Sequence, residues 1–301
     1  MHFFHLYERY KHRINQKLFY TLNQLPFQKS SLLKAMKYSV FSGSKRLRSS
    51  LIYSTGDVFK VNITTLDVIS TAIEFIHSYS LIHDDLPCMD NDNFRRGKIS
   101  CHVKYGESTS LLAGDALQSL AFNILSNSFM PNVSNLKRIK MISELSYSIG
   151  SSGMCMGQNL DLEAEKKDVN LSELEIINLY KTSFLMRSAV RLVYFSSNNF
   201  SKSILSILDL FSISIGLAFQ IQDDILDFKK DSVKTDNKKI IKKHTYPLII
   251  GLDESRKKIK QLHKKSFLAL NSLKKKFQYQ HARKINKIYH QMYEINLIMS
   301  I

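Results

Sequence analysis

Cysteine is scarce in this chain of 301 residues, which holds only Cys88, Cys101 and Cys155. An odd number of cysteines with no CxxC spacing argues against a disulfide framework and against a metal site built from thiolates. This usage fits a reducing compartment, so we expect the protein in the cytoplasm.

Proline and glycine are also sparse, with 4 and 10 residues, and no Gly-, Ser- or Pro-rich linker divides the chain. Hydrophobic residues make up 44% of it, which is enough to fill a sizeable core. We therefore expect a single domain over residues 1–301.

Long apolar runs suited to a membrane are few. In the N-terminal stretch MHFFHLYERYKHR, the apolar segment before the first charged residues is too short for the core of a signal peptide. The most apolar long window, residues 203–220, is studded with serine, carries Asp209 and ends in Gln220, so it predicts a buried helix. We expect no stable membrane insertion.

Acidic residues are fewer than basic ones: the chain has 26 Asp and Glu and 43 Lys and Arg, which gives a net charge of +17. Such an excess suits nucleic acid or an anionic membrane surface. The lysines are scattered, however, and no nucleic-acid-binding signature accompanies them. We expect no nucleic acid partner, and small polyanionic substrates remain the alternative.

Apolar residues at helical spacing are abundant. Ile69, Ile73 and Ile76 step by four and three residues, and strand-like alternation is scarce. Residues 171–215 and 252–301 contain neither proline nor glycine, as expected of long helices. The pattern predicts an all-α helical bundle.

The stretch LIHDDLPCMDNDNFRRG, residues 81–97, concentrates acid and then base after an apolar helical run. On an ideal helix Asp90 would lie about 240° around the helix axis from Asp84, so the two side chains would point in different directions. Pro87 cannot continue a regular helix, so Asp84, Asp85 and Asp90 can converge on one ion only if the helix bulges or ends there.

Two other interpretations of this stretch fail. A calcium loop starting at Asp90 would have Phe94 at its fifth position, Arg96 in place of the required glycine and Cys101 at the twelfth. A phosphate-binding P-loop is excluded because no glycine-rich turn ends in Gly-Lys-Ser/Thr.

A second acidic cluster lies in QIQDDILDF, residues 220–228. Asp223 and Asp227 are four residues apart, which stacks their carboxylates on one helix face about 6 Å apart, with Asp224 alongside. Like charges at that spacing destabilise a helix unless a cation binds between them, and Mg²⁺ prefers carboxylate oxygens. The alternative is a solubilising helix face, but the flanking residues are strongly apolar.

Basic side chains near these clusters are suited to phosphate, because arginine binds phosphate oxygens in a bidentate manner and lysine adds a compact charge. The candidates are Lys45, Arg46, Arg48, His77, Arg95 and Arg96. Taken singly, each could instead be a surface charge or a structural histidine.

These residues together resemble the trans-prenyltransferases, or polyprenyl diphosphate synthases, and most nearly the bacterial farnesyl diphosphate synthases. DDLPCMD is similar to the family's DDxxxxD motif, DDILD to its DDxxD, GSKRLRS to its GGKRxRP, GQNLDLEAE to its GQxxDL and YKTSFL to its KT motif. The matching segments run from about residue 43 to 251 in family order. Ser44 and Ser49 depart from GGKRxRP, and the loop 229–246 is shortened, with Lys234 and Asp236 as replacements for family residues.

The resemblance implies an isoprenoid synthase bundle around a central cavity, as a homodimer. It implies condensation of isopentenyl diphosphate with dimethylallyl and geranyl diphosphate to farnesyl diphosphate (C15). Mg²⁺, expected as three ions and replaceable by Mn²⁺, would assist ionisation, and the isopentenyl double bond would then attack the allylic cation. The released diphosphate would take the proton.

The resemblance also implies roles for single residues. The metal-binding carboxylates would be Asp84, Asp85, Asp90, Asp223, Asp224 and Asp227. Isopentenyl diphosphate would be bound by Lys45, Arg48, His77 and Arg96. The allylic diphosphate and its cation would be bound by Arg95, Lys181, Thr182, Gln220 and Lys243, of which Lys181, Thr182 and Gln220 would be catalytic.

Product length is expected to depend on Tyr79, which lies five residues before Asp84, a depth of about 7 Å along the helix axis. A large aromatic residue there, with the small Ser80 beside it, resembles a floor that stops growth at C15. The alternative is that Tyr79 only packs in the bundle.

Other functions remain open at this point. A geranyl or geranylgeranyl diphosphate synthase would differ in product length. A terpene cyclase of the same fold carries a different second metal motif, and a non-catalytic subunit would be expected to lack one aspartate motif.

Overall fold

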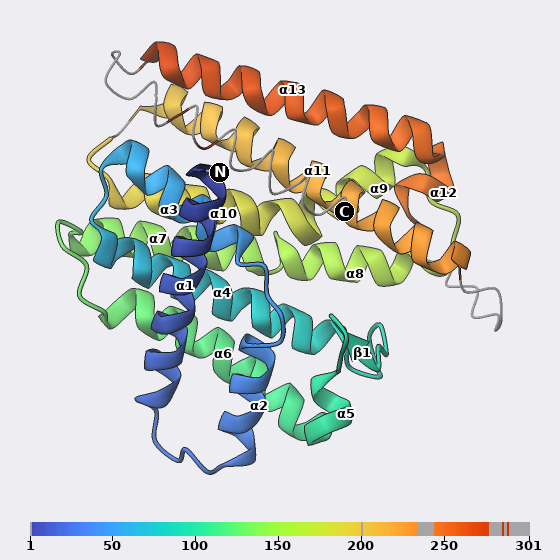
Figure 1. Ribbon diagram of the computed structural model, residues 1–301, viewed down its shortest axis with the longest axis horizontal. Helices are drawn as coiled ribbons and strands as arrows, with labels where there is room; N and C mark the ends of the chain where they lie inside the picture. Colours follow the sequence, from blue (N-terminus) through green and yellow to red (C-terminus); the bar gives the residue numbers. More distant parts are fainter. Residues whose placement is uncertain (1, 200, 234–243, 277–284, 286–287, 289–301) are drawn as a thin grey trace. The chain divides into compact units, whose positions relative to one another are not determined.

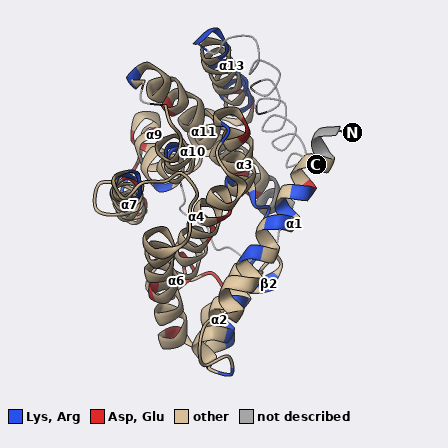
Figure 2. Ribbon diagram, turned by 90° about the vertical axis from the view of Figure 1, so that its left-hand side faces the viewer, with Lys and Arg blue, Asp and Glu red and all other residues tan. Residues whose placement is uncertain are grey.

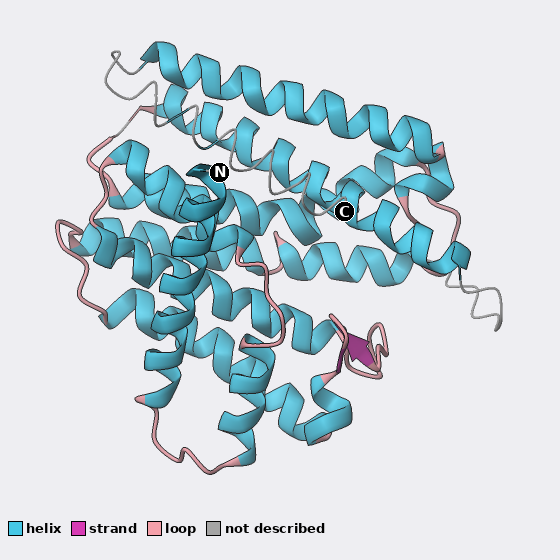
Figure 3. Ribbon diagram, in the orientation of Figure 1, coloured by secondary structure: helices cyan, strands magenta, loops and turns pink. Residues whose placement is uncertain are grey.

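The computed structural model of the protein describes residues 2–199, 201–233, 244–276, 285 and 288 (Figure 1). Most of these residues, 78%, are helical. The sheet found in this part of the chain is a short antiparallel hairpin of β1 (Phe94–Arg95) and β2 (Lys98–Ile99) (Figure 3). The predicted all-α fold is confirmed.

The chain divides into two compact units, the first ending at Ile142 and the second beginning at Ser143. The helices of the first unit are α1 (His2–Asn23), α2 (Ser31–Val40), α3 (Leu47–Phe59), α4 (Ile63–Asp84), α5 (Cys101–Tyr105) and α6 (Glu107–Asn127). The boundary between the two units falls within helix α7 (Asn135–Ile149). The second unit holds α8 (Met154–Ala164), α9 (Leu171–Asn178), the π-helix η1 (Leu179–Ser183), α10 (Phe184–Ser196), α11 (Lys202–Val233), α12 (Tyr246–Ile250) and α13 (Leu252–Lys276).

Helix α4 is the central helix of the first unit and packs against α3 and α6. It begins where the Asn62 side chain accepts a hydrogen bond from the Thr64 N–H, which satisfies a donor that the first turn leaves without a helical partner. Ile69, Ile73 and Ile76, the residues whose spacing predicted a helix, are fully buried. Their burial fixes the rotation of α4 and therefore the direction in which its last turn points.

Helix α11 has the same place in the second unit, where it packs against α10, η1 and α13. Its residues Lys202–Phe228 are long and apolar enough to cross a membrane by length and composition alone, and half of the most apolar window is buried within the protein. Leu208, Phe211 and Ile215 are buried at the predicted helical spacing.

Two sequence-based boundaries were wrong. The loop predicted for 229–246 is wrong at both ends, because α11 continues to Val233 and α12 begins at Tyr246. Residues 229–233, KKDSV, contain neither glycine nor proline, so nothing stops the helix after Asp227. The uninterrupted stretch 171–215 is likewise divided, into α9, η1, α10 and the start of α11.

Lysine and arginine are found in both units, along α1 in the first and α13 in the second (Figure 2). The positive charge noted in the sequence is therefore shared between the two units. The three cysteines are all free thiols, with Cys101 buried and the other two exposed.

Candidate active site

The first aspartate motif lies where α4 ends. Asp84 is the last residue of the helix, and the chain then turns back so that the Asp90 N–H donates to the Asp84 carbonyl at 2.9 Å. The Asn91 N–H donates to the Leu86 carbonyl at 3.1 Å and closes the same turn around Pro87. The helix thus ends where the sequence required it to end, and Asp90 is brought beside Asp84.

Asp85 is directed away from solvent and is only 3% exposed. Arg95, which β1 carries, donates to its Oδ1 through Nε at 2.8 Å and also through Nη2. Arg95 also reaches Asp92 Oδ2 at 3.3 Å. Burial raises the pKa of Asp85 although Arg95 opposes the shift. The structure therefore pairs a predicted metal ligand with a predicted phosphate ligand.

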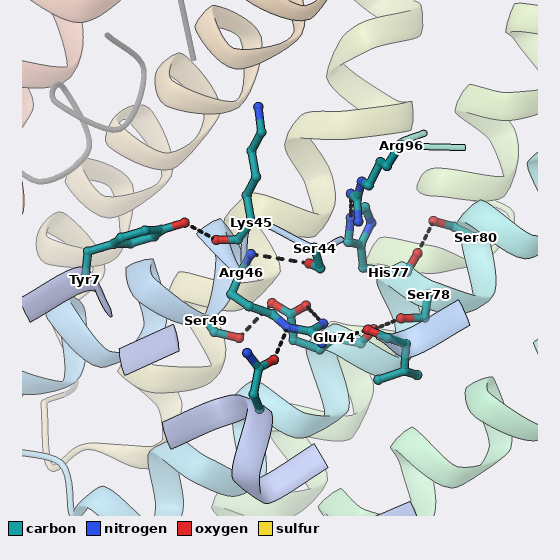
Figure 4. A network of polar contacts seen from close by, with 12 residues as sticks. Tyr7, Ser44, Lys45, Arg46, Ser49, Glu74, His77, Ser78, Ser80 and Arg96 are labelled. Carbon is teal, nitrogen blue, oxygen red and sulfur yellow. Dashed lines mark hydrogen bonds and ion pairs between the residues drawn. The ribbon is translucent and has the colours of Figure 1, made fainter. Parts of the chain in front are cut away.

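Arg46 forms a buried polar network at the start of α3 (Figure 4). Its Nη1 donates to Glu74 Oε2 at 2.8 Å, its Nη2 to the Val40 carbonyl at 2.7 Å and its Nε to Asn15 Oδ1 at 2.9 Å. These partners belong to α4, α2 and α1. Arg46, one of the candidate phosphate ligands in the sequence, is therefore used to join four helices.

The two serines that depart from the family motif take part in this network. The Ser49 hydroxyl donates to Glu74 Oε1 at 2.7 Å, and the Ser44 hydroxyl accepts from the Arg46 N–H at 3.3 Å. Burial acts to raise the pKa of Glu74, but Arg46 and Ser49 hold it below its ordinary value. Glu74 is thus a buried carboxylate that stays charged.

The residues predicted for isopentenyl diphosphate surround this network. The Lys45 side chain is exposed and extends away from the Arg46–Glu74 pair (Figure 4), while its carbonyl accepts from the Tyr7 hydroxyl. Arg48, two residues further on, is buried at 9% exposure.

His77 lies beside Arg96 in the same region (Figure 4), with Arg96 Nη2 at 3.3 Å from His77 Nε2. A guanidinium can only donate, so this nitrogen accepts and the ring is neutral. Burial, together with Arg48 and Arg96, lowers the pKa of His77 well below its ordinary value. The expected donor to phosphate is therefore a neutral ring that orients an arginine. Arg96 itself has a positive φ of 53°.

The residues predicted to set product length lie on the last two turns of α4. Tyr79 is buried, and its ring meets the His83 ring edge to face, with centroids 5.0 Å apart. The Ser80 hydroxyl donates to the His77 carbonyl at 3.0 Å.

The second aspartate motif lies on an uninterrupted part of α11. Asp223 is part-exposed and Asp227 exposed, whereas Asp224 is buried. Asp224 accepts from the Gln220 amide at 3.0 Å and from the Tyr246 N–H at 3.2 Å. Burial raises the pKa of Asp224 to about 6.

The three predicted catalytic residues share the second unit with this motif. The Thr182 hydroxyl donates to Gln220 Oε1 at 2.8 Å, so that Thr182, Gln220 and Asp224 form one chain of hydrogen bonds. Lys181 donates to Asp161 Oδ2 at 2.6 Å. Lys181 and Thr182 both lie in η1, and π-helical turns often occur at functional sites.

Asp161 was missed as a site residue by sequence reasoning. It belongs to the quoted segment GQNLDLEAE, where its match to the aspartate of the GQxxDL motif, four residues after Gly157, is the signal. Gly157 lets α8 approach η1 closely, because a Cβ there would be 2.2 Å from the Lys181 backbone nitrogen. That approach places Asp161 next to the Lys181 side chain.

Lys243, predicted to bind the allylic diphosphate, lies outside the described residues, as do Lys234 and Asp236.

The oxygen donors of the two motifs fit a hard cation such as Mg²⁺, which binds through a few carboxylates and completes its shell with water and substrate phosphate. Asp84 and Asp90 come together through the turn, and Asp223 and Asp227 share one helix face. Within the described parts of the chain, no group of three or more acidic, histidine or cysteine side chains forms a complete metal centre. The carboxylates of each motif, taken by themselves, supply the oxygen donors that such an ion uses beside water and substrate phosphate.

The chain belongs to the polyprenyl synthetase family, whose model matches residues 29–285. It is 65% identical over 277 residues to the farnesyl diphosphate synthase of Buchnera aphidicola subsp. Schizaphis graminum, covering 92% of this chain and 94% of that protein.

Solved structures agree in fold. The geranyltransferase of Legionella pneumophila matches with a TM-score of 0.85 and 31% identity, over 97% of both chains. The geranyltransferase of Helicobacter pylori, complexed with magnesium and isoprenyl diphosphate, matches with a TM-score of 0.79 and 27% identity, over 96% of this chain and 97% of that one. The fold is that of the isoprenyl synthases.

Proposed function

We propose that this protein is a farnesyl diphosphate synthase, which condenses isopentenyl diphosphate with dimethylallyl and then geranyl diphosphate to the C15 product. The observation that carries the proposal is the pair of aspartate motifs in a member of the polyprenyl synthetase family. The 65% identity to a farnesyl diphosphate synthase over nearly the whole chain supports this specificity.

Asp84 and Asp90 in the first motif, and Asp223 and Asp227 in the second, would hold Mg²⁺, expected as three ions with Mn²⁺ as a substitute. When bound, these ions would stabilise the negative charge that develops on the leaving diphosphate. Asp85 and Asp224 also belong to the predicted metal set. Their burial supports an additional role, in which they orient Arg95 and Gln220.

The basic residues would bind the two diphosphates separately. Lys45, Arg48 and Arg96 would contact isopentenyl diphosphate, with neutral His77 aligning Arg96. Arg95, Lys181 and Lys243 would add positive charge to the allylic diphosphate. Because Lys181 is paired with Asp161, substrate binding would have to compete with or share that pair.

The allylic cation needs oriented dipoles and protection from water. The Thr182–Gln220–Asp224 chain supplies the dipoles, because each amide atom of Gln220 already has a fixed partner. The departing diphosphate would accept the proton lost after condensation, so no side chain is needed as a general base. Tyr79, with Ser80 beside it, would close the apolar end and stop growth at C15.

We propose that the two units form one domain, since the family match spans both, and that the protein is a cytoplasmic homodimer. Exposed apolar side chains of the first unit are the candidates for the dimer interface. They are Leu111, Leu112, Phe129, Leu136 and Ile139.

The test is to incubate the pure protein with dimethylallyl diphosphate, isopentenyl diphosphate and Mg²⁺, and to measure product length. C15 should dominate, and chelation should stop turnover until Mg²⁺ or Mn²⁺ is restored. C20 as the main product would indicate a geranylgeranyl diphosphate synthase, and C10 a geranyl diphosphate synthase. If no elongation occurs, geranyl or farnesyl diphosphate is added alone: cyclic hydrocarbons would then indicate a terpene cyclase, and no product a non-catalytic subunit.

A further inference from the structure

We propose that His83 is a positioning residue for product length, which holds the Tyr79 ring in the place where it ends chain growth. The inference rests on the proposed function, in which Tyr79 is the floor for the growing chain.

Tyr79 and His83 are four residues apart on α4 and therefore share one face of the helix. Their ring centroids are 5.0 Å apart and their planes are nearly perpendicular, at 85°. This edge-to-face geometry is attractive and restricts both rings. Tyr79 is only 7% exposed, so the His83 ring is part of the surroundings that fix its rotamer.

His83 is itself held by α6, which packs against α4 in the same unit. Its Nε2 donates to the Leu111 carbonyl at 3.1 Å and lies 3.7 Å from Asp115 Oδ1. The ring lies directly over Gly114, where a Cβ would be 2.2 Å from Nε2 and 2.4 Å from Cδ2. No larger residue fits at Gly114 unless the ring moves.

The contacts form a continuous series from the α6 backbone through His83 to Tyr79. A growing apolar chain that displaces the Tyr79 ring would have to break its edge-to-face contact with His83, which is hydrogen-bonded to the backbone of a second helix. Removing His83 frees the Tyr79 ring to rotate, so that longer chains fit.

The experiment measures the C20-to-C15 product ratio with saturating isopentenyl diphosphate. His83→Ala should raise this ratio about 2- to 10-fold, the range that an aromatic pair contributes. In the Tyr79→Ser background the same change should have no further effect, because His83 acts through Tyr79. The ratio is informative even if His83→Ala slows turnover, since both products leave the same enzyme.

Gly114→Ala gives a second route, because it displaces the His83 ring and leaves both aromatic residues in the chain. It should raise the ratio as His83→Ala does. Asp115→Asn, which changes only a longer contact at 3.7 Å, should keep the wild-type ratio.

Two results would overturn the proposal while leaving the function intact. One is an unchanged ratio in both His83→Ala and Gly114→Ala where Tyr79→Ser lengthens the product. The other is a full His83→Ala effect in the Tyr79→Ser background, which would make His83 part of the wall itself. A wild-type enzyme that forms no C15 product would instead reject the proposed function.

Discussion

In the first aspartate motif the chain leaves α4 at Asp84 and turns back on itself, whereas in the second it stays helical from Asp223 through Asp227 and beyond. The side chains nevertheless divide in the same way. Asp85 and Asp224, the second residue of each pair, are buried, and their neighbours are more exposed. Each motif thus has one buried carboxylate, here called inward, and others that are more exposed, here called outward, although the backbone conformation of the two motifs differs.

The inward carboxylates differ in their partners. Asp85 accepts hydrogen bonds from the cationic Arg95, whereas Asp224 accepts from the neutral Gln220 amide and the Tyr246 N–H. Burial raises the pKa of both, and to about 6 for Asp224. The two buried aspartates hold the same place in their motifs and differ in whether a cation or neutral groups donate to them.

The largest expected effect is on kcat and concerns the more exposed carboxylates of the two motifs. Asp84→Ala and Asp223→Ala should each lower kcat about 10³-fold, because each removes an oxygen that would bind the ion stabilising the leaving group. Steady-state kinetics at saturating Mg²⁺ measure this. Asp92→Asn is the matched control and should stay close to wild type. Near-normal turnover in either alanine variant would remove that residue from the metal site.

A smaller effect separates the two inward carboxylates. Asp85→Asn should lower the free energy of unfolding by about 2 kcal/mol, because Arg95 loses its buried charged partner but keeps the exposed Asp92 and is partly exposed to solvent. Asp224→Asn should cost about 1 kcal/mol or less, because the Gln220 amide can rotate to serve an asparagine. Urea unfolding without Mg²⁺ gives both values. Equal losses would show that the nature of the donor does not matter.

The smallest effect concerns pH and a third buried carboxylate, Glu74, whose pKa lies below its ordinary value of 4.5. A lowered pKa means that the folded state binds this proton less tightly than the unfolded state. The resulting stabilisation is present above pH 4.5 and is lost as the pH falls through the folded pKa. Unfolding at pH 3.5 to 7 should show the wild-type advantage over Glu74→Gln shrinking toward acid. An advantage that grows toward acid would contradict the Arg46 pairing.

Much of the fold could be predicted from the sequence because its causes are local. The spacing of Ile69, Ile73 and Ile76 predicts the buried face of α4, and Pro87 explains why the helix ends beside Asp84. The end of α11 was misplaced because the lysine-rich residues 229–233 look like a loop by charge but contain no residue that stops a helix.

The remaining features depend on partners far along the chain. Arg46 could not be distinguished from Arg48 by pattern, because Glu74 and Asn15, which bind Arg46, are 28 and 31 residues away. The π-helical turn that carries Lys181 has no simple sequence signal either. The family resemblance supplied Lys181 and left Arg46 out of the predicted diphosphate ligands, and the structure shows the buried network that Arg46 forms instead.

Arg96 has a backbone conformation that glycine would adopt without strain, with φ at 53°, just before Gly97 at 75°. A left-handed residue with a side chain costs roughly 1 kcal/mol. Replacing Arg96 with glycine would relax the hairpin and remove a guanidinium proposed to bind substrate. Selecting variants for heat resistance alone would therefore favour glycine at position 96 and lose the guanidinium. At this position, higher thermal stability is expected to accompany lower activity.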